Sequence, residues 1–336
     1  MPRRFLPVCF CPHVWRVSPK VLRGSSIALL GSVLFLAGCS PRQVMVHQFG
    51  ALVETGMARL ETSGDVALVE AGLPGQITLL EALLANDPAD QRLRLLLARL
   101  YAAQGLLYLE PLVEAAAWEI PAPWLEGDAP PNHSLKKSQL GRVFQRGAAH
   151  ALAVLESQQP DSLAQLSRVN RIGAYLKTAS ADEVPALFWY ALNLGAWVNH
   201  HLDDLSAIAQ AHVAERIMRR VVELQPDYYH GFAHLFLIAY YGSRPAMLGG
   251  RPEAAQNHYD AYRAMAEASA PESLSVFLGE VYYARYCLPL RQAREAYTTL
   301  LTPIATSPIN VNTRLFDALA IRRAQLYLVA VDRLFD

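Results

Sequence analysis

Cysteine is scarce in this sequence, with four in 336 residues. Cys9 and Cys11 lie in a basic and apolar N-terminal segment, Cys39 ends that segment, and Cys287 stands alone in the remainder. One cysteine cannot form an intramolecular disulfide, so we expect core packing to stabilise the folded part. Because Cys287 lies in an apolar and aromatic run, we predict a buried structural thiol and not a reactive one.

Sequence motifs that carry catalysis are also missing. The chain has no Gly-x-Ser-x-Gly, no phosphate-binding glycine-rich loop, no Cys-x-x-Cys and no His-Glu-x-x-His. Gly249 and Gly250 are too few to cradle a phosphate and are better explained as a bend before Pro252. We therefore predict that the protein is not an enzyme and needs no cofactor.

The N-terminal segment has the pattern of an export signal. Residues 1–38 carry five basic side chains and no acidic one, and they end in a short apolar run. Since a membrane-spanning helix needs roughly twenty apolar residues, this pattern is typical of a secretory signal peptide. The run closes with Leu-Ala-Gly-Cys at 36–39, which resembles a bacterial lipobox. We expect 1–38 to be removed and Cys39 to be lipidated; the alternative is a plain signal peptide beside a chance cysteine.

Loss of this signal would leave a mildly acidic chain. With its five basic side chains removed, 25 basic side chains remain against 30 acidic ones. This balance argues against nucleic acid as a partner.

Three segments repeat one spacing of residues before a proline. The intervals are four, three and five residues, typical of the second helix of a tetratricopeptide (TPR) repeat, where small and large side chains interlock and proline ends the helix. The segments are Gln76, Leu80, Leu83 and Pro88; Ala148, Leu152, Leu155 and Pro160; and Ala214, Met218, Val221 and Pro226. Sustained period-two alternation is missing. We predict an all-α, TPR-like helical repeat superhelix of antiparallel helix pairs over 49–336, with 39–48 as a tether.

Prolines suggest where several helices end. We expect a short helix or turn over 64–73 that Pro74 breaks, and a helix from Gln292 that Pro303 ends. Four prolines between 120 and 132 predict a surface loop.

The connection at 242–252 is about seven residues longer than a regular 34-residue repeat would need. Met247 and Leu248 lie in it and would be exposed unless something covers them. We predict that this connection shapes an interface or the mouth of a cavity; the alternative is a loop folded back on its own hairpin. The candidate interface residues are Arg244, Pro245, Met247, Leu248, Gly249 and Gly250.

Large aromatic side chains are dense over 188–197 and 232–241. Such residues pack helix against helix, yet each tyrosine carries a hydroxyl that a dry core has to satisfy. We predict that these stretches line an apolar lumen; the alternative is a solid core. The candidate cavity residues are Trp189, Trp197, Phe236, Tyr240 and Tyr241.

Two histidine pairs have spacings that could bind a metal. His230 and His234 lie four residues apart, and a His-His-Leu-Asp-Asp run occupies 200–204. We favour hydrogen-bonded helix histidines for the first pair and helix capping by aspartate for the second, and predict no metal site.

Six short segments carry a resemblance to a known family. They are Asn-His-His-Leu-Asp-Asp at 199–204, Leu-Gln-Pro-Asp-Tyr at 224–228, Gly-Phe-Ala-His at 231–234, Tyr-Tyr-Gly-Ser-Arg-Pro at 240–245, Leu-Gly-Gly-Arg-Pro-Glu-Ala-Ala at 248–255 and Tyr-Tyr-Ala-Arg at 282–285. Together they resemble the T-component (TatT) family of lipoproteins associated with tripartite ATP-independent periplasmic (TRAP) transporters.

The resemblance implies a function in binding. A member would be a periplasm-facing lipoprotein that binds a TRAP-type solute-binding protein, forms homo-oligomers and holds a hydrophobic ligand in an apolar cavity. The alternative is a general TPR-like scaffold or assembly lipoprotein of the envelope without a transport role. A third hypothesis is an enzyme that uses the His and Asp clusters. Ser40 after the lipidated cysteine favours export to the outer membrane of a Gram-negative cell.

The lipobox makes a direct prediction. In cells fed a fatty-acid analogue, the natural chain should become labelled and the Cys39→Ser variant should not, because the thiol is the attachment point. Equal labelling of the two chains would contradict the assignment of Cys39.

Overall fold

Short polar side chains start several of the helices in the computed structural model, which describes residues 41–124, 133–268, 275–310 and 312–335. Carboxylate oxygens of Asp65 and Asp90 accept hydrogen bonds from backbone amides three residues ahead, each at 2.9 Å. Ser275 Oγ does the same at 3.2 Å. These caps satisfy amides that have no partner inside the helix.

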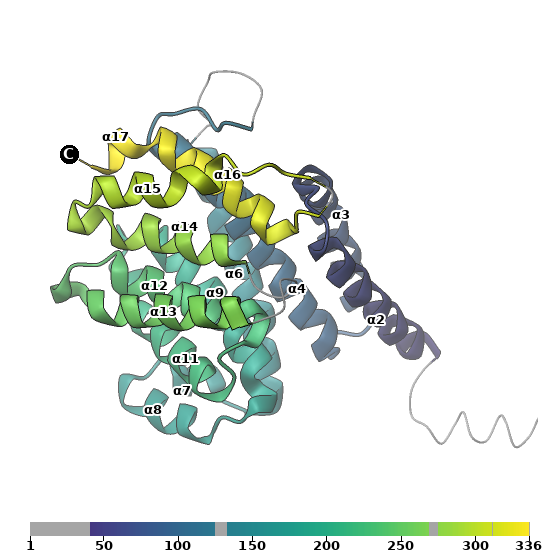
Figure 1. The fold of residues 1–336 in the computed structure, drawn as a ribbon. Coiled ribbons are helices and arrows are strands. Elements are labelled where there is room, and N and C mark those ends of the chain that lie inside the picture. The colour runs from purple at the N-terminus through teal and green to yellow at the C-terminus, as the bar shows by residue number, and fades with distance from the viewer. Residues whose placement is uncertain (1–40, 125–132, 269–274, 311, 336) are drawn as a thin grey trace, which may run out of the picture. The chain divides into compact units, whose positions relative to one another are not determined.

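The described residues fold into helices joined by turns (Figure 1). In chain order the elements are α2 (Pro41–Glu61), α3 (Val66–Leu84), α4 (Gln91–Ala103), the π-helix η1 (Gln104–Leu109), α5 (Glu110–Ala117), α6 (His133–Gln158), α7 (Ser162–Leu166), α8 (Val169–Thr178), η2 (Ala181–Glu183), α9 (Val184–Asn199), α10 (Leu205–Ile208), α11 (Ala211–Leu224), α12 (Tyr228–Gly242), η3 (Ala246–Leu248), α13 (Pro252–Ala268), α14 (Val276–Cys287), η4 (Pro289–Arg291), α15 (Arg294–Ala305), α16 (Leu315–Val329) and α17 (Val331–Leu334).

No strand occurs in the part of the chain that is described, which confirms the all-α prediction. The TPR-like arrangement of repeats stays a prediction. Residues 46–336 form one compact unit, and the residues before them belong to another unit, of which only 41–45 are described. Cys39 and the expected signal peptide lie outside the described residues, and 41–48 of the expected tether belong to α2.

Helices that follow each other in the chain pack together in the second half of the compact unit. The series α11 to α16 is contiguous, each helix contacting the next (Figure 1). The first half is built differently, because α4, α6 and α9 contact one another across long sequence separations. The C-terminal α16 also contacts α3 and α5. It therefore joins the two ends of the unit.

The predicted helix ends at prolines were wrong in two places. Helix α3 continues through Pro74 to Leu84, and α15 continues through Pro303 to Ala305. In α3 the buried residues Leu73, Ile77 and Leu80 keep the helical spacing across Pro74. Burial of this apolar face outweighs the hydrogen bond that proline removes. By length and composition α3 could also cross a membrane, a weak criterion that core helices meet too.

Helix α12 departs from regular helix at its start. Tyr229, His230 and Gly231 have φ angles of 43°, 56° and 68°, in the left-handed region. For Tyr229 and His230 this conformation is costly, so the surrounding contacts must hold it. The Tyr229 ring packs edge-on against Trp189 at 4.6 Å, and its hydroxyl donates to Glu61 at 3.1 Å. The TPR-like spacing at 214–226 contains no sign of this turn.

Candidate ligand pocket

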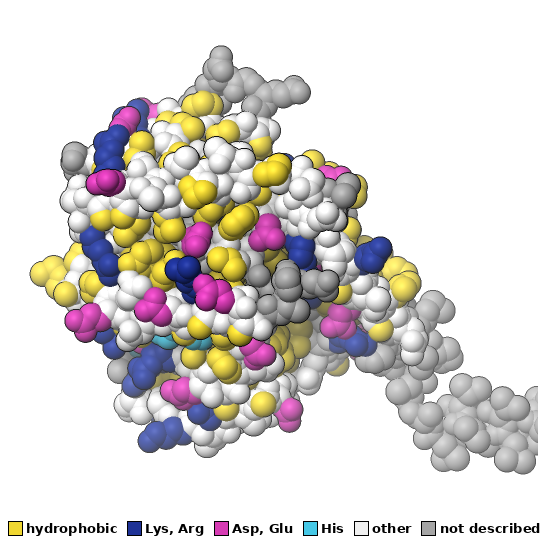
Figure 2. All heavy atoms as spheres, viewed as in Figure 1, with side chains coloured by type: hydrophobic (Ala, Val, Ile, Leu, Met, Phe, Trp, Pro, Cys, Tyr) yellow, Lys and Arg dark blue, Asp and Glu magenta, His cyan; other side chains and the backbone are white. Residues whose placement is uncertain are grey.

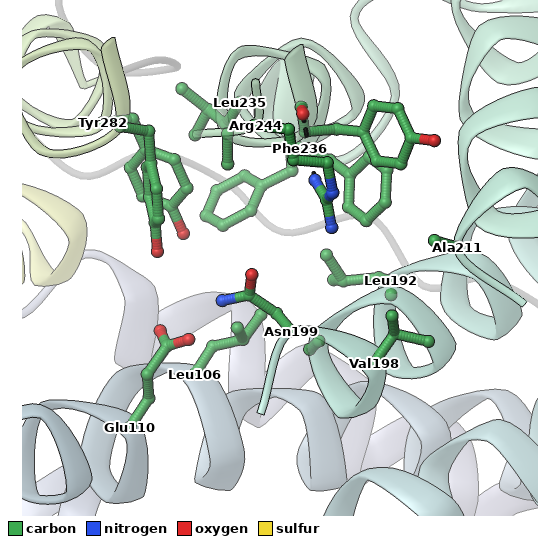
Figure 3. A pocket seen from close by; sticks show the side chains of 16 residues that line it. Leu106, Glu110, Leu192, Val198, Asn199, Ala211, Leu235, Phe236, Arg244 and Tyr282 are labelled. Atoms are coloured by element: carbon green, nitrogen blue, oxygen red, sulfur yellow. Dashed lines mark hydrogen bonds between the residues drawn. The ribbon is translucent and has the colours of Figure 1, made fainter. Parts of the chain in front are cut away.

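An apolar pocket lies between α9, α12 and α14, with η1 and the start of α5 at its base (Figure 3). Its empty space is about 600 Å³ including the open mouth. Its walls are mainly Leu106, Leu192, Val198, Phe232, Leu235 and Phe236.

Close approach of two helices shapes one wall. A Cβ atom on Gly195 of α9 would lie 2.3 Å from the Phe236 ring of α12, so only glycine leaves room for that ring. Phe236 in turn stacks on Tyr240 with ring centroids 6.3 Å apart. Both rings line the pocket. The small residue of α9 thus permits an aromatic wall on α12.

The base of the pocket is charged but internally neutralised. Glu110 of α5 is buried and accepts a hydrogen bond from Arg323 of α16 at 2.7 Å. Its other oxygen lies 2.9 Å from His200 Nε2. Arg323 also donates to the backbone oxygen of Leu106 in η1. The irregular turn of η1 therefore has a fixed polar partner from the far end of the chain.

A second carboxylate extends this network. Glu114, one turn after Glu110, accepts from Arg285 of α14 and from the Tyr327 hydroxyl of α16, each at 3.0 Å. Arg323 donates to the same hydroxyl at 2.7 Å. Two buried acids and two arginines therefore connect α5, α14 and α16, with each charge paired and hydrogen-bonded.

The charges shift the ionisation of Glu110. Burial alone would raise the pKa of this carboxyl, but Arg323 and His200 outweigh burial and lower it to about 2. Burial also raises the pKa of the nearby Tyr282 hydroxyl to about 12, so that side chain is a neutral phenol at the base of the pocket. Glu110 is accordingly an anion at neutral pH, and the network satisfies its charge.

Arg244 lies at the opposite end from Glu110, where the lining residues Tyr240, Ala211 and Asn199 are only partly buried, and we call this end the mouth. In Figure 3 its guanidinium extends from the α12 side toward Asn199 of α9. Nη1 donates to the backbone oxygen of Tyr240 at 2.9 Å, and the guanidinium carbon lies 4.2 Å from the centre of the Tyr240 ring. Burial lowers the pKa of Arg244, although an arginine remains charged.

The connection after α12 braces Arg244. Gly250 has no space for a side chain, because a Cβ there would lie 1.7 Å from the Arg244 backbone oxygen. Its amide donates to Pro245 O at 3.1 Å, and the next amide, of Arg251, donates to Tyr241 O at 3.0 Å. The glycine pair that the sequence suggested as a bend is thus a close backbone approach that closes this loop.

The predicted cavity residues separate into two groups. Phe236 and Tyr240 line the pocket, whereas Trp189 lines a smaller neighbouring space of about 250 Å³. Trp197 stacks on His201 with ring centroids 4.9 Å apart. Tyr241 is buried, donates to Glu215 and accepts from Arg251 at 2.6 Å. That the aromatic stretches 188–197 and 232–241 line one apolar lumen stays a prediction.

The predicted interface residues also differ in position. Met247 is 89% and Leu248 61% exposed, and Pro245 and Gly249 are exposed as well. Figure 2 shows apolar side chains at the edge of the face where the α12–α13 connection lies in Figure 1. Arg244 is half-buried at the pocket and Gly250 is buried. The loop therefore has one side toward solvent and one toward the pocket, and its part in an interface stays a prediction.

The histidine pairs are engaged elsewhere. The left-handed turn at the start of α12 separates His230, which lies 3.4 Å from Glu61 Oε2, from His234, whose Nδ1 lies 3.1 Å from Nδ1 of His258. Asp204 caps α10 through the Ser206 amide at 2.8 Å, as predicted. In the described part of the chain, no group of three or more His, Cys, Asp or Glu side chains could hold a metal.

Sequence reasoning missed the base of the pocket. Leu106, Glu110 and Tyr286 carried no motif, and Tyr282 entered only within the Tyr-Tyr-Ala-Arg segment. A usable signal was present in the charges: Glu110 and Glu114 stand in the apolar run 105–117, and Arg323 stands in an apolar helix. Isolated charges in such runs indicate buried pairs.

A family model described as the TRAP transporter T-component matches residues 62–335. The chain belongs to this family. T-components are accessories of TRAP transporters of the bacterial cell envelope and are not an enzyme family. An uncharacterised protein of Treponema pallidum (strain Nichols) is similar at 26% identity over 267 residues, which covers 78% of this chain and 77% of that protein. The family comparison confirms the resemblance drawn from the six segments and the association with TRAP transporters.

The buried network predicts a specific dependence of stability on pH. The pKa of Glu110 is lower in the folded chain than the ordinary value of 4.5, so its contribution is complete above about pH 4.5 and is lost as pH falls toward 2. Glu110→Gln should lower the free energy of unfolding at neutral pH by about 3–5 kcal/mol, because Arg323 loses its charged partner. Urea denaturation at a series of pH values measures both effects.

Glu54 provides the matched control. It pairs with Arg92 at 3.0 Å on the surface, with both side chains well exposed, so Glu54→Gln should cost less than about 1 kcal/mol. The difference in stability between the natural chain and Glu110→Gln should shrink as pH falls from 4.5 to 2. A difference that is small or independent of pH would contradict the importance of the buried pair.

Proposed function

We propose that this chain is a periplasm-facing lipoprotein that assists a TRAP transporter by holding an apolar ligand in its pocket and by binding the transporter's solute-binding protein. The observation that supports this proposal is the apolar pocket. Its walls are leucine, valine and phenylalanine side chains from several helices, and its deepest charges are already neutralised by one another. Burial of apolar ligand surface at roughly 25 cal/mol per Å² would supply the affinity.

The family supports the partner in this proposal. T-components are associated with TRAP transporters, and the component that handles free solute is the natural partner for a protein that binds a ligand. In the proposal Cys39 anchors the chain to the outer membrane, copies of the chain associate, and the helices form a TPR-like superhelix. The Leu-Ala-Gly-Cys sequence supports the anchor.

A larger side chain at the mouth of the pocket tests whether the pocket holds an apolar ligand. Ala211 lines the pocket at the start of α11, whereas Ala209 is exposed two residues earlier. In membranes that hold the full chain, a neutral alkyl diazirine should label peptides of α9 and α12. Ala211→Trp should reduce this labelling by about tenfold, as the loss of ~1.4 kcal/mol would, and Ala209→Trp should not. Absence of pocket labelling in the natural chain would leave only the scaffold function.

Changes in the exposed loop after α12 test whether it binds the solute-binding protein. Replacing Met247 and Leu248 by serine should weaken crosslinking to the solute-binding protein of the same transporter by about tenfold or more, because central apolar residues dominate many interfaces. Leu163 and Leu290 are also exposed, at 47% and 55%, and their replacement by serine is the control. Circular dichroism should be the same for all variants. Unchanged crosslinking of the Met247 and Leu248 variant would exclude this loop from the interface.

A further inference from the structure

The pocket has opposite electrostatic character at its two ends. Its inner end contains Glu110, which Arg323 and His200 already satisfy. Its mouth contains Arg244, and among the described residues no carboxylate oxygen lies within 4 Å of that guanidinium. Glu215 of α11 pairs with Arg251 at 3.2 Å and accepts a hydrogen bond from the Tyr241 hydroxyl.

Arg244 has donors to spare. One Nη1 bond goes to the Tyr240 backbone and the face of the guanidinium lies on the Tyr240 ring. The remaining N–H groups have no acceptor among the described residues, and the guanidinium faces the pocket in Figure 3. A half-buried arginine without an acid is unfavourable because burial removes water from a charge that nothing nearby balances. A bound anion would remove that cost.

We propose that the ligand of this pocket is an organic acid with an apolar body, whose carboxylate binds Arg244 at the mouth while its body lies against Leu192, Leu235 and Phe236. This inference rests on the proposed function, which requires that the pocket hold a ligand. The planar guanidinium offers paired N–H donors that match the two oxygens of a carboxylate. Asn199 faces Arg244 across the mouth and adds an amide to the same site.

The orientation follows from the charges. A carboxylate at the inner end would lie beside Glu110 and the Tyr282 ring, where a second anion is repelled. An organic cation is disfavoured at both ends, because Arg244 repels it at the mouth and Glu110 already has two partners. The head group therefore stays at the mouth and the apolar body points inward toward Leu106.

The geometry of the loop is part of the site. The amide of Arg251 and the absence of a side chain at Gly250 hold the backbone around Arg244, and Tyr240 supports its guanidinium from one face. The loop thus orients the cation before any ligand arrives, which reduces the entropy lost on binding. In this proposal Arg244 binds the ligand, and Gly250 holds Arg244 in position.

Photolabelling with a matched pair of probes tests the proposal on the full chain in membranes. The probes are octanoic acid and 1-octanol, each with the same diazirine in its tail. The acid should label the α9 and α12 peptides at about 10- to 100-fold lower concentration than the alcohol, the range that a charge-assisted hydrogen bond supplies. Unlabelled octanoate should compete and unlabelled octanol should compete weakly.

Variants identify the anchor. Arg244→Met should abolish the preference for the acid over the alcohol, whereas Arg244→Lys should keep part of the preference. Arg219 is exposed on α11. The control variant Arg219→Met should keep the full preference for the acid over the alcohol. Thermal melts show whether each variant folds, and the ratio in the natural chain does not depend on any variant.

The outcomes separate the two proposals. Equal labelling of the natural chain by acid and alcohol would overturn the carboxylate anchor and leave the apolar pocket of the proposed function intact. A preference for the acid that survives in Arg244→Met would also overturn it. Labelling of pocket peptides by neither probe would overturn the carboxylate anchor together with the apolar ligand of the proposed function.

Discussion

The structure depends on a network of four charges, three of them buried, that begins at the base of the pocket with Glu110. Glu110 and Glu114 of α5 bind Arg323 of α16 and Arg285 of α14, so the first third of the chain is joined to its C-terminal helices. Such charges are stable in the interior only when each is paired and hydrogen-bonded. The requirement favours the observed arrangement of α5, α14 and α16, in which all four charges are paired.

The same network makes an apolar pocket possible next to charged groups. Glu110 forms part of the pocket lining, yet its oxygens are used by Arg323 and His200. The inner end is therefore polar in composition but has little unsatisfied charge to attract water. At the mouth Arg244 lacks an acid in the described structure, so the two ends differ. This electrostatic difference between the two ends, and not the volume of the pocket, would determine which way round a ligand lies.

Local patterns in the sequence predicted what depends on local physics. The apolar periodicity predicted helices and no strands, and Asp204 capped α10 as its position suggested. Met247 and Leu248 were expected in an exposed connection and are exposed. Predictions from proline failed at Pro74, because an apolar face that is buried through packing can stabilise a helix despite a missing hydrogen bond. The sequence also contained no sign of the left-handed turn at Tyr229, because contacts with distant residues hold that turn.

The sequence by itself determined the helical class and, through several short segments taken together, the family. It also predicted a folded part without an internal disulfide and an export signal that ends in a lipobox cysteine. These features depend on composition and on neighbours a few residues apart. Only the tertiary structure decided that Phe236 and Tyr240 line the pocket while Trp197 and Tyr241 do not, and that Arg244 faces Asn199. An aromatic helix has rings on all sides, and which side borders a space depends on helices that are far apart in the chain. The pairing of Glu110 with Arg323, 213 residues away, is the clearest case.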